Sequence, residues 1–323
     1  MISRRTFSLL AAVGAASLAL SAQATEAWPS RPVSIVVAYP PGSTMDILAR
    51  LVAQNLQEEL KASFLVENRP GASGRIGAEY VARAAKDGYT LFISGNSTHS
   101  ANPSLFKKLG YDPVKDFTPI IRIATMPYAL AVREKSNIKT LAEFVKQAQQ
   151  SKGRFAYAYG SPSAQVASVA FAASEGFDAL GVPYKGQPPA LTDLIGGQVD
   201  FIMADLPVLV PYVHAGTLRV LTVFSDKRSP LLPQVPTMLE GGVKGYDLAA
   251  WIGVSGPAGL PPEITSKLSD ALSRILVKPE VTARLQTLGM QHSPNTPNQF
   301  AKYVDEQLLS WGQRVREAGI PAE

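Results

Sequence analysis

The chain has 323 residues, no cysteine and a formal net charge of +5, with Lys and Arg scattered among Asp and Glu. Without cysteine the protein forms no disulfides and performs no thiol chemistry, and scattered charge argues against nucleic acid as a partner. The length leaves room for two domains that are stabilised by ordinary buried cores.

Residues 1–24 read as an export signal. Arg4 and Arg5 precede an apolar run at 9–20 that is too short to span a bilayer, and small residues up to Ala24 form a cleavage site. The arginine pair is also typical of the twin-arginine route, and ordinary secretion stays open. We expect a signal peptide that is cut after Ala24 and a mature protein in the periplasm.

From Val33 onward, short β-branched apolar runs alternate with segments of helical period. This alternation predicts parallel sheets covered by helices, the α/β class. A first set of elements is expected as strand 33–39, helix 47–60, strand 64–67, helix 79–85 and strand 90–94. A second set is expected as helix 141–150, strand 155–159, helix 165–175, strand 182–184, helix 189–195 and strand 199–203. The last third is expected as strand 251–255 followed by helices 262–276, 280–288 and 297–318.

These sets predict two lobes with a hinge and a ligand cleft between them. Residues 25–126 form the first part of lobe 1 and residues 127–226 form lobe 2. Because the helices of the last third need a sheet to cover, residues 227–323 are expected to return to lobe 1. The chain then crosses between the lobes twice, which is the usual basis of a hinge.

The loop 40–46 joins the carboxyl end of a strand to the start of a helix, where open α/β sheets bind ligands. Gly42 lets the backbone approach a guest, Ser43 and Thr44 offer hydroxyls, and free amides at the helix start favour a carboxylate. A proline-stopped turn in which Ser43, Thr44 or Asp46 caps the helix explains the same residues. Both interpretations stay open.

A second polar loop, 95–99, follows the strand at 90–94 and is expected at the same sheet edge. Ser97 and Thr98 can donate to a carboxylate, and His99 can supply a charge or a neutral hydrogen bond. A capping or packing role for His99 is the alternative.

The second lobe repeats the strand-loop-helix arrangement at 160–165, where hydroxyls and amides can face the first loop across a cleft. The residues concerned are Gly160, Ser161, Ser163 and Gln165. Asp205 follows the strand at 199–203 and can accept a hydrogen bond from a ligand amine or hydroxyl. A helix cap is the alternative for both places.

The sequence gives less support to dinucleotide binding, serine hydrolysis or metal binding. The glycines at 71, 74 and 77 lack the spacing of a dinucleotide fingerprint and predict a structural turn, although Arg69 and Arg75 beside them can serve as counter-charges. No serine stands in a nucleophile elbow, and Ser97 with His99 is the nearest pairing of a nucleophile with a base. The three histidines have no second ligand at metal spacing, so we expect neither a metal nor a cofactor.

Several short motifs, in this order, resemble the Bug family of extracytoplasmic solute receptors, the binding components of tripartite tricarboxylate transporters. The resemblance runs almost end to end and rests on residues 28–32, 40–50, 68–72, 87–91, 97–99, 183–186, 231–237 and 256–259. It implies a type 2 periplasmic-binding fold whose lobes close on a ligand carboxylate held by amides, hydroxyls and ordered water.

By this likeness the carboxylate grip falls on Gly42, Ser43, Thr44 and Asp46, and the loop 97–99 adds a wall. Ser161, Ser163 and Gln165 reach in from the second lobe, and Asp205 finishes the cleft. Ser43, which replaces a glycine of many relatives, and Met45 are departures that reshape the pocket. Plausible apolar walls are Tyr39, Met45, Tyr157, Tyr159 and Tyr184, which favour an aromatic or mixed carboxylate, with a core role as the alternative.

We therefore expect a monomeric periplasmic receptor, not an enzyme, that binds a small carboxylate and delivers it to membrane transporter subunits. Two alternatives remain: a receptor that reports to a membrane sensor, and a periplasmic serine hydrolase that uses Ser97 and His99.

Overall fold

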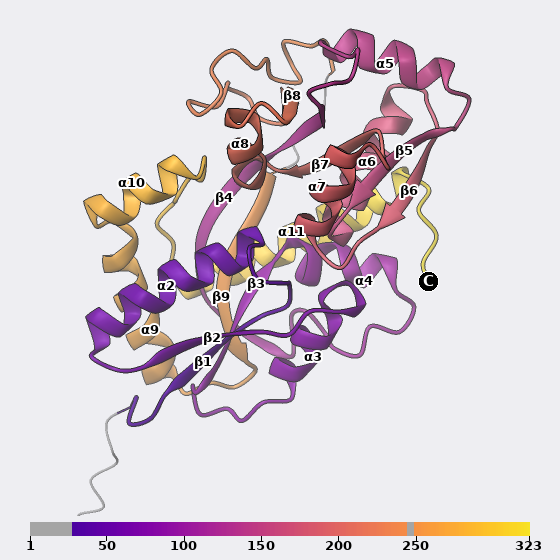
Figure 1. Ribbon diagram of the computed structural model, residues 1–323. Helices are drawn as coiled ribbons and strands as arrows, with labels where there is room; N and C mark the ends of the chain where they lie inside the picture. Colours follow the sequence, from indigo (N-terminus) through magenta and orange to yellow (C-terminus); the bar gives the residue numbers. More distant parts are fainter. Residues whose placement is uncertain (1–27, 244–248) are drawn as a thin grey trace, which may run out of the picture.

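The computed structural model describes residues 28–243 and 249–323, so the expected signal peptide at 1–24 lies outside the described residues. The chain forms two lobes, each with a sheet between helices, and the strand β4 (Phe117–Arg133) runs through both (Figure 1). The α/β class expected from the sequence is confirmed.

The first lobe contains β1 (Val33–Val37), α2 (Thr44–Leu60), β2 (Phe64–Asn68), η1 (Ala72–Gly74), α3 (Arg75–Ala82), β3 (Thr90–Gly95), η2 (Ser97–Ala101), α4 (Asn102–Leu105), β9 (Ala249–Pro257), α9 (Pro262–Leu276), α10 (Pro279–Thr287) and α11 (Pro297–Glu317). The second lobe contains α5 (Leu141–Gln150), β5 (Phe155–Tyr159), α6 (Pro162–Ser174), β6 (Ala179–Pro183), α7 (Gln187–Gly196), β7 (Phe201–Asp205), α8 (Leu206–His214) and β8 (Leu218–Val223).

The strands are ordered β2-β1-β3-β9-β4-β7-β5-β6, with β8 on β4. β1 pairs in parallel with β2 and β3, and β5 pairs in parallel with β6 and β7, as the alternating pattern predicts. The expectation of purely parallel sheets is wrong for β4 and β9, which are antiparallel to their neighbours. The carboxyl ends of β1, β3, β5 and β7 face the space between the lobes, and the loops that follow them build the site.

The strand β4 changes partners along its length. Its first part, Phe117 to Pro127, pairs with β9, whereas the part from Tyr128 onward pairs with β7 and β8. One continuous strand therefore carries the chain from one lobe to the other. The expected boundary at 126/127 falls inside this strand, and the domain boundaries stay a prediction.

The helices α2 and α6 begin three residues before their predicted starts. The hydroxyl of Ser43 accepts from the amide of Asp46, and that of Ser161 accepts from the amide of Ala164, each at 3.3 Å. These serines are N-caps, so the residues expected in loops form the first helical turns. The side chains of α2 at Leu48, Val52 and Leu56 are buried in the core, as i, i+4, i+8 spacing requires.

The helix α11 packs along η2 and β4 of the first lobe and reaches α6 of the second. The chain after it is held by two hydrogen bonds between Glu323 and the segment Leu105 to Lys107. Within the described part of the chain, no helix is long and apolar enough to span a membrane.

Candidate functional site

Two connected cavities lie between the lobes. The inner one has a volume of about 30 Å³, room for about one or two water molecules. The first lobe lines it with Tyr39, Ser43, Thr44, Met45, Asn96 and Ser97. The second lobe adds Gly160, Ser161, Ser163, Gln187 and Asp205, and β4 adds Tyr128.

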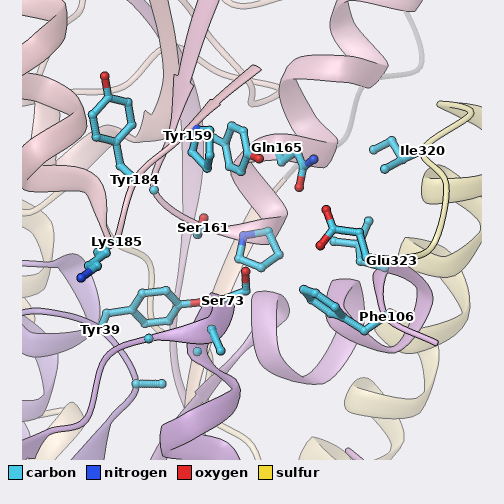
Figure 2. Close-up of a pocket in the computed structure, with 18 of the residues that line it drawn as sticks. Tyr39, Ser73, Phe106, Tyr159, Ser161, Gln165, Tyr184, Lys185, Ile320 and Glu323 are labelled. Carbon is cyan, nitrogen blue, oxygen red and sulfur yellow. The ribbon is translucent and has the colours of Figure 1, made fainter. Parts of the chain in front are cut away.

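The outer cavity is larger, about 360 Å³, and shares Tyr39, Gly160 and Ser161 with the inner one. Figure 2 shows its walls, which include the aromatic rings of Tyr39, Phe106 and Tyr159, whereas the Tyr184 ring points away from them and its hydroxyl donates to Asp193 at 2.6 Å. The polar side chains that line the cavity include Ser73, Gln165, Lys185 and Glu323. A volume above 300 Å³ is in the range of small-molecule sites, and the walls of this cavity are polar and apolar in equal parts.

Tyr39 stands where the two cavities meet. Tyr39 is 7% exposed, and its buried hydroxyl donates to no acceptor among the described residues, although the neighbouring Ser97 side chain lies close enough to act against the rise of its pKa. Burial raises the pKa of Tyr39 above its ordinary value, so the hydroxyl keeps its proton. An unpaired buried donor is unfavourable, and one that borders two cavities is placed to bond with a guest.

The first turn of α2 supplies further donors. The amides of Asp46 and Ile47 bond to the side chain and carbonyl of Ser43, whereas those of Thr44 and Met45 make no hydrogen bond within the described chain. Free amides and the helix dipole both favour an anion at this end.

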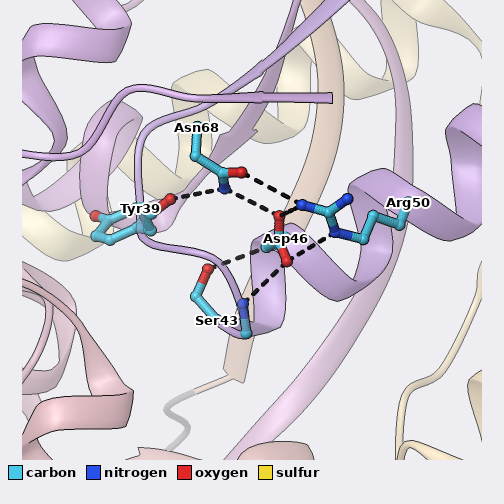
Figure 3. Close-up of polar contacts among 6 residues, drawn as sticks. Tyr39, Ser43, Asp46, Arg50 and Asn68 are labelled. Carbon is cyan, nitrogen blue, oxygen red and sulfur yellow. Dashed lines mark hydrogen bonds and ion pairs between the residues drawn. The ribbon is translucent and has the colours of Figure 1, made fainter. Parts of the chain in front are cut away.

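Asp46 fixes the loop 40–46 in place (Figure 3). Its carboxylate accepts hydrogen bonds from the Gly42 amide at 2.9 Å, from Asn68 Nδ2 at 2.9 Å, and from Arg50 Nε and Nη2 at 3.0 Å each. Asn68 Nδ2 also donates to the carbonyl of Tyr39 at 3.0 Å. Burial alone would raise the pKa of Asp46, but the bonds from Arg50, Gly42 and Asn68 outweigh it and hold the pKa below its ordinary value.

Three hydroxyls and an amide connect the two lobes. Ser97 Oγ lies 2.6 Å from Ser163 Oγ, and the Tyr128 hydroxyl donates to Ser163 Oγ at 2.7 Å. Asn96 Nδ2 donates to the Tyr128 hydroxyl at 3.3 Å. Ser163 of the second lobe thus contacts both Ser97 of the first lobe and Tyr128 on the connecting strand.

A second bridge joins Thr44 of the first lobe to Gln187 and Asp205 of the second. The Thr44 hydroxyl donates to Gln187 Oε1 at 3.3 Å, and Gln187 Nε2 donates to Asp205 Oδ2 at 3.0 Å. Burial raises the pKa of Asp205, while its contacts with Thr44 and Gln187 act in the opposite direction. Asp205 precedes α8, yet its side chain makes no capping hydrogen bond to that helix.

His99 lies in the core of the first lobe. Its ring is 1% exposed and packs against Phe117, Phe92 and Trp251, with centroids 4.7, 5.9 and 6.1 Å away. Burial lowers the pKa of His99 to about 3, so the ring is neutral at physiological pH. Its Nδ1 pairs with Thr98 Oγ1 at 2.9 Å, whereas the Ser97 hydroxyl pairs with Ser163. The described contacts therefore do not join Ser97 to His99 as a nucleophile and a base.

The structure brings most of the expected site residues together. Those that line one or both cavities are Tyr39, Ser43, Thr44, Ser97, Gly160, Ser161, Ser163, Gln165 and Asp205. Those that line neither are Gly42, Asp46, Thr98 and His99. A role in ligand binding stays a prediction for all of them.

Three residues that line the inner cavity, Asn96, Tyr128 and Gln187, were not expected from the sequence. Asn96 lies in the loop 95–99 beside Ser97, and Gln187 follows the motif 183–186, so the position in the sequence was a signal for both. Tyr128 lies in an apolar stretch that gave no signal. Of the expected tyrosine walls, Tyr157 lines neither cavity and instead packs against Phe201 and Tyr159.

The cations near the cleft differ in their partners. Arg69 pairs with Glu67 at 2.6 Å and lies over the Tyr80 ring, and Arg75 lies 3.9 Å from Glu79. Neither lines a cavity, whereas Lys185 lines the outer one.

Comparison with known proteins places this geometry among solute receptors. The model of the tripartite tricarboxylate transporter family receptors matches residues 48–320. The protein BugT of Bordetella pertussis is 31% identical over 297 residues, which cover 91% of each chain.

Two solved structures share the fold closely. Rpa4515 of R. palustris, solved with adipate, has a TM-score of 0.89 and 35% identity, with 92% of this chain and 100% of that chain covered. MatC of Rhodopseudomonas palustris, solved with malate, has a TM-score of 0.85 and 33% identity, with 89% and 100% covered. The expected periplasmic-binding fold and the resemblance to Bug receptors are confirmed.

Proposed function

Because the chain belongs to the tripartite tricarboxylate transporter receptor family, we propose that it binds a small carboxylate-bearing solute between its lobes. In this proposal the closed protein then delivers the solute to membrane transporter subunits. Two solved relatives carry adipate and malate, both of which are carboxylates.

The observation that carries the proposal is a set of donors without acceptors at the junction of the cavities. The buried Tyr39 hydroxyl and the amides of Thr44 and Met45 donate to no acceptor in the described chain. A carboxylate offers two oxygens with about four acceptor sites, which suits such a set. Hydrogen bonds to a charged group contribute on the order of 1.5–3 kcal/mol each.

The volumes of the two cavities indicate which part of the ligand each can hold. The inner one has room for a carboxylate or its bridging water, and the outer one, with about 360 Å³, has room for the body of the ligand. The rings of Phe106 and Tyr159 offer apolar contact there, consistent with an aromatic or mixed carboxylate.

The proposal also covers where the protein acts and whether it acts as a monomer. The arginine pair and apolar run at 4–20 favour export to the periplasm, where a receptor of this family meets its transporter. We propose that the protein acts as a monomer whose closed surface the transporter recognises. A deletion strain that responds to the ligand but still grows on it would favour the sensing alternative over transport.

A thermal-shift screen of the protein tests the proposed function. The panel contains aliphatic dicarboxylates, citrate, aromatic acids and amino acids. A ligand at about 100 times its dissociation constant adds about 2.7 kcal/mol to stability. Stabilisation by one class of acid supports a receptor; the absence of a shift with every acid overturns the carboxylate proposal.

Tyr39→Phe separates ligand binding from folding. The variant loses a donor that has no partner in the unliganded protein, so its stability should be unchanged or slightly higher. Its affinity for the ligand should fall roughly 10- to 150-fold, the loss of one hydrogen bond to a charged group. Tyr80→Phe, on α3 and away from both cavities, is the matched control. An unchanged affinity in Tyr39→Phe would show that this hydroxyl does not hold the ligand.

A further inference from the structure

Asp205 sets the charge of the inner cavity. Among the described residues that line this cavity, Asp205 carries the one acidic side chain, and no Lys, Arg or His stands beside it. The remaining polar side chains are neutral hydroxyls and amides from Ser43, Thr44, Asn96 and Gln187 among others.

The Asp205 carboxylate interacts with neutral groups, and no charged side chain of the described chain is paired with it. It follows the end of β7 and precedes α8, but its side chain leaves that helix uncapped. Its carboxylate accepts a hydrogen bond from the neutral amide of Gln187 at 3.0 Å and also interacts with the Thr44 hydroxyl, which donates to Gln187 Oε1 at 3.3 Å. The carboxylate is thus turned toward the closing interface between the lobes.

A carboxylate in a closed cavity is unfavourable unless a cation or several donors satisfy it. The Gln187 amide and the Thr44 hydroxyl replace only part of the lost water. A ligand whose inner end presents only carboxylate oxygens meets like charge at short range when Asp205 is ionised, and escapes this repulsion only if Asp205 takes up a proton, a change that burial favours. A ligand with a donor beside its carboxylate can satisfy both Asp205 and the free amides of Thr44 and Met45.

We infer that Asp205 selects carboxylates that bear an ammonium or hydroxyl donor next to the carboxylate, over unsubstituted acids of the same length. This inference rests on the proposed function, since it names the ligand class of the same site. The donor faces Asp205, the adjacent carboxylate faces the start of α2, and the rest of the ligand extends past Tyr39 into the outer cavity.

Calorimetric titration with matched ligand sets tests the inference. Succinate, malate and aspartate share one carbon skeleton and differ at one carbon, which carries hydrogen, hydroxyl or ammonium. Glutarate with glutamate and adipate with 2-aminoadipate extend the comparison to longer chains. In the wild-type protein the donor-bearing member of the best-bound set should bind at least 10-fold more tightly than the unsubstituted one.

Asp205→Asn removes the charge and retains the shape. It should weaken the donor-bearing ligand at least 10-fold and leave the unsubstituted acid unchanged or more tightly bound. Asp178→Asn, which changes an exposed aspartate of the same lobe, is the charge-matched control and should leave both affinities as they are.

The outcomes separate the two proposals. Equal affinity of the wild-type protein for the unsubstituted and donor-bearing acids overturns the inference and leaves the receptor function in place. The same holds if Asp205→Asn weakens all acids alike. Failure of the wild-type protein to bind any carboxylate overturns the proposed function together with the inference. The wild-type ligand series is decisive even if Asp205→Asn does not fold.

Discussion

The loop 40–46 of the first lobe and the loop 160–164 of the second both join a strand to a helix with a serine N-cap, yet they are held differently. Asp46 ties the first loop to Arg50 and Asn68 of its own lobe. In the second loop, the Ser163 hydroxyl bonds across to Ser97 and to Tyr128 on the connecting strand. One half of the site is therefore built before the lobes meet, and closure completes the other half.

Asp46→Asn should have the largest effect, because the first loop depends on one carboxylate. The variant loses the ion pair with Arg50 and weakens several charge-assisted hydrogen bonds. Its free energy of unfolding, measured by urea denaturation, should fall by about 2–3 kcal/mol. Asp178→Asn should stay within about 0.5 kcal/mol of wild type. A loss that small in Asp46→Asn would mean that the loop is held by other contacts.

The same carboxylate gives the loop a pH dependence. The folded pKa of Asp46 lies below its unfolded value of about 3.9, so its contribution to stability is fully present above that value. The contribution is lost as the pH falls through the folded pKa. The difference in unfolding free energy between wild type and Asp46→Asn should therefore stay constant from pH 7 to 5 and shrink below pH 4. A difference that persists at pH 2 would point to packing instead of charge.

Gly186→Ala tests whether the second lobe must approach the first lobe closely for the ligand to bind. A Cβ at Gly186 would stand 2.8 Å from Cδ of Pro40 in the other lobe, and the backbone φ of 162° suits any residue. The variant should fold normally and close incompletely, with ligand affinity reduced roughly 10- to 100-fold, about 1.4–2.7 kcal/mol. Gly196→Ala, on the same helix with no atom near its Cβ, is the control. Wild-type affinity in Gly186→Ala would mean that the lobes need not close this far.

Ser163→Ala should have the smallest effect. The variant loses its bonds to Ser97 and Tyr128, contacts that depend on closure. Affinity should fall about fivefold, close to 1 kcal/mol, and the unliganded protein should become more open. Ser168→Ala removes a hydroxyl that bonds within α6 and should leave affinity unchanged. Equal losses in the two variants would indicate a general weakening of the helix.

Sequence periodicity predicted the parallel strands and most of the helices, since a buried stripe or run leaves a local pattern, but it did not predict α4, α8 or β8. It missed β4, because Pro119 and Pro127 interrupt an otherwise strand-like stretch. In the structure the pairing of β4 shifts register just after Pro119, and Pro127 ends its pairing with β9, so neither proline breaks a regular ladder.

The candidate site was predictable where loops follow strands, since the carboxyl ends of parallel strands meet at one edge. The role of Asp46 in holding the loop could not be predicted, because Asp46 lies in α2 whereas Asn68, one of its partners, lies at the end of β2. The place of His99 was also hidden, since only tertiary packing turns its ring toward Phe117 and Trp251. Tyr128 became part of the site because β4 passes between the lobes.

Small-angle scattering with and without a saturating carboxylate ligand tests the central claim most directly. The account predicts a smaller radius of gyration with ligand for wild type and Gly196→Ala, and a reduced change for Gly186→Ala. An unchanged radius in wild type, under conditions where calorimetry shows tight binding, would contradict capture by lobe closure.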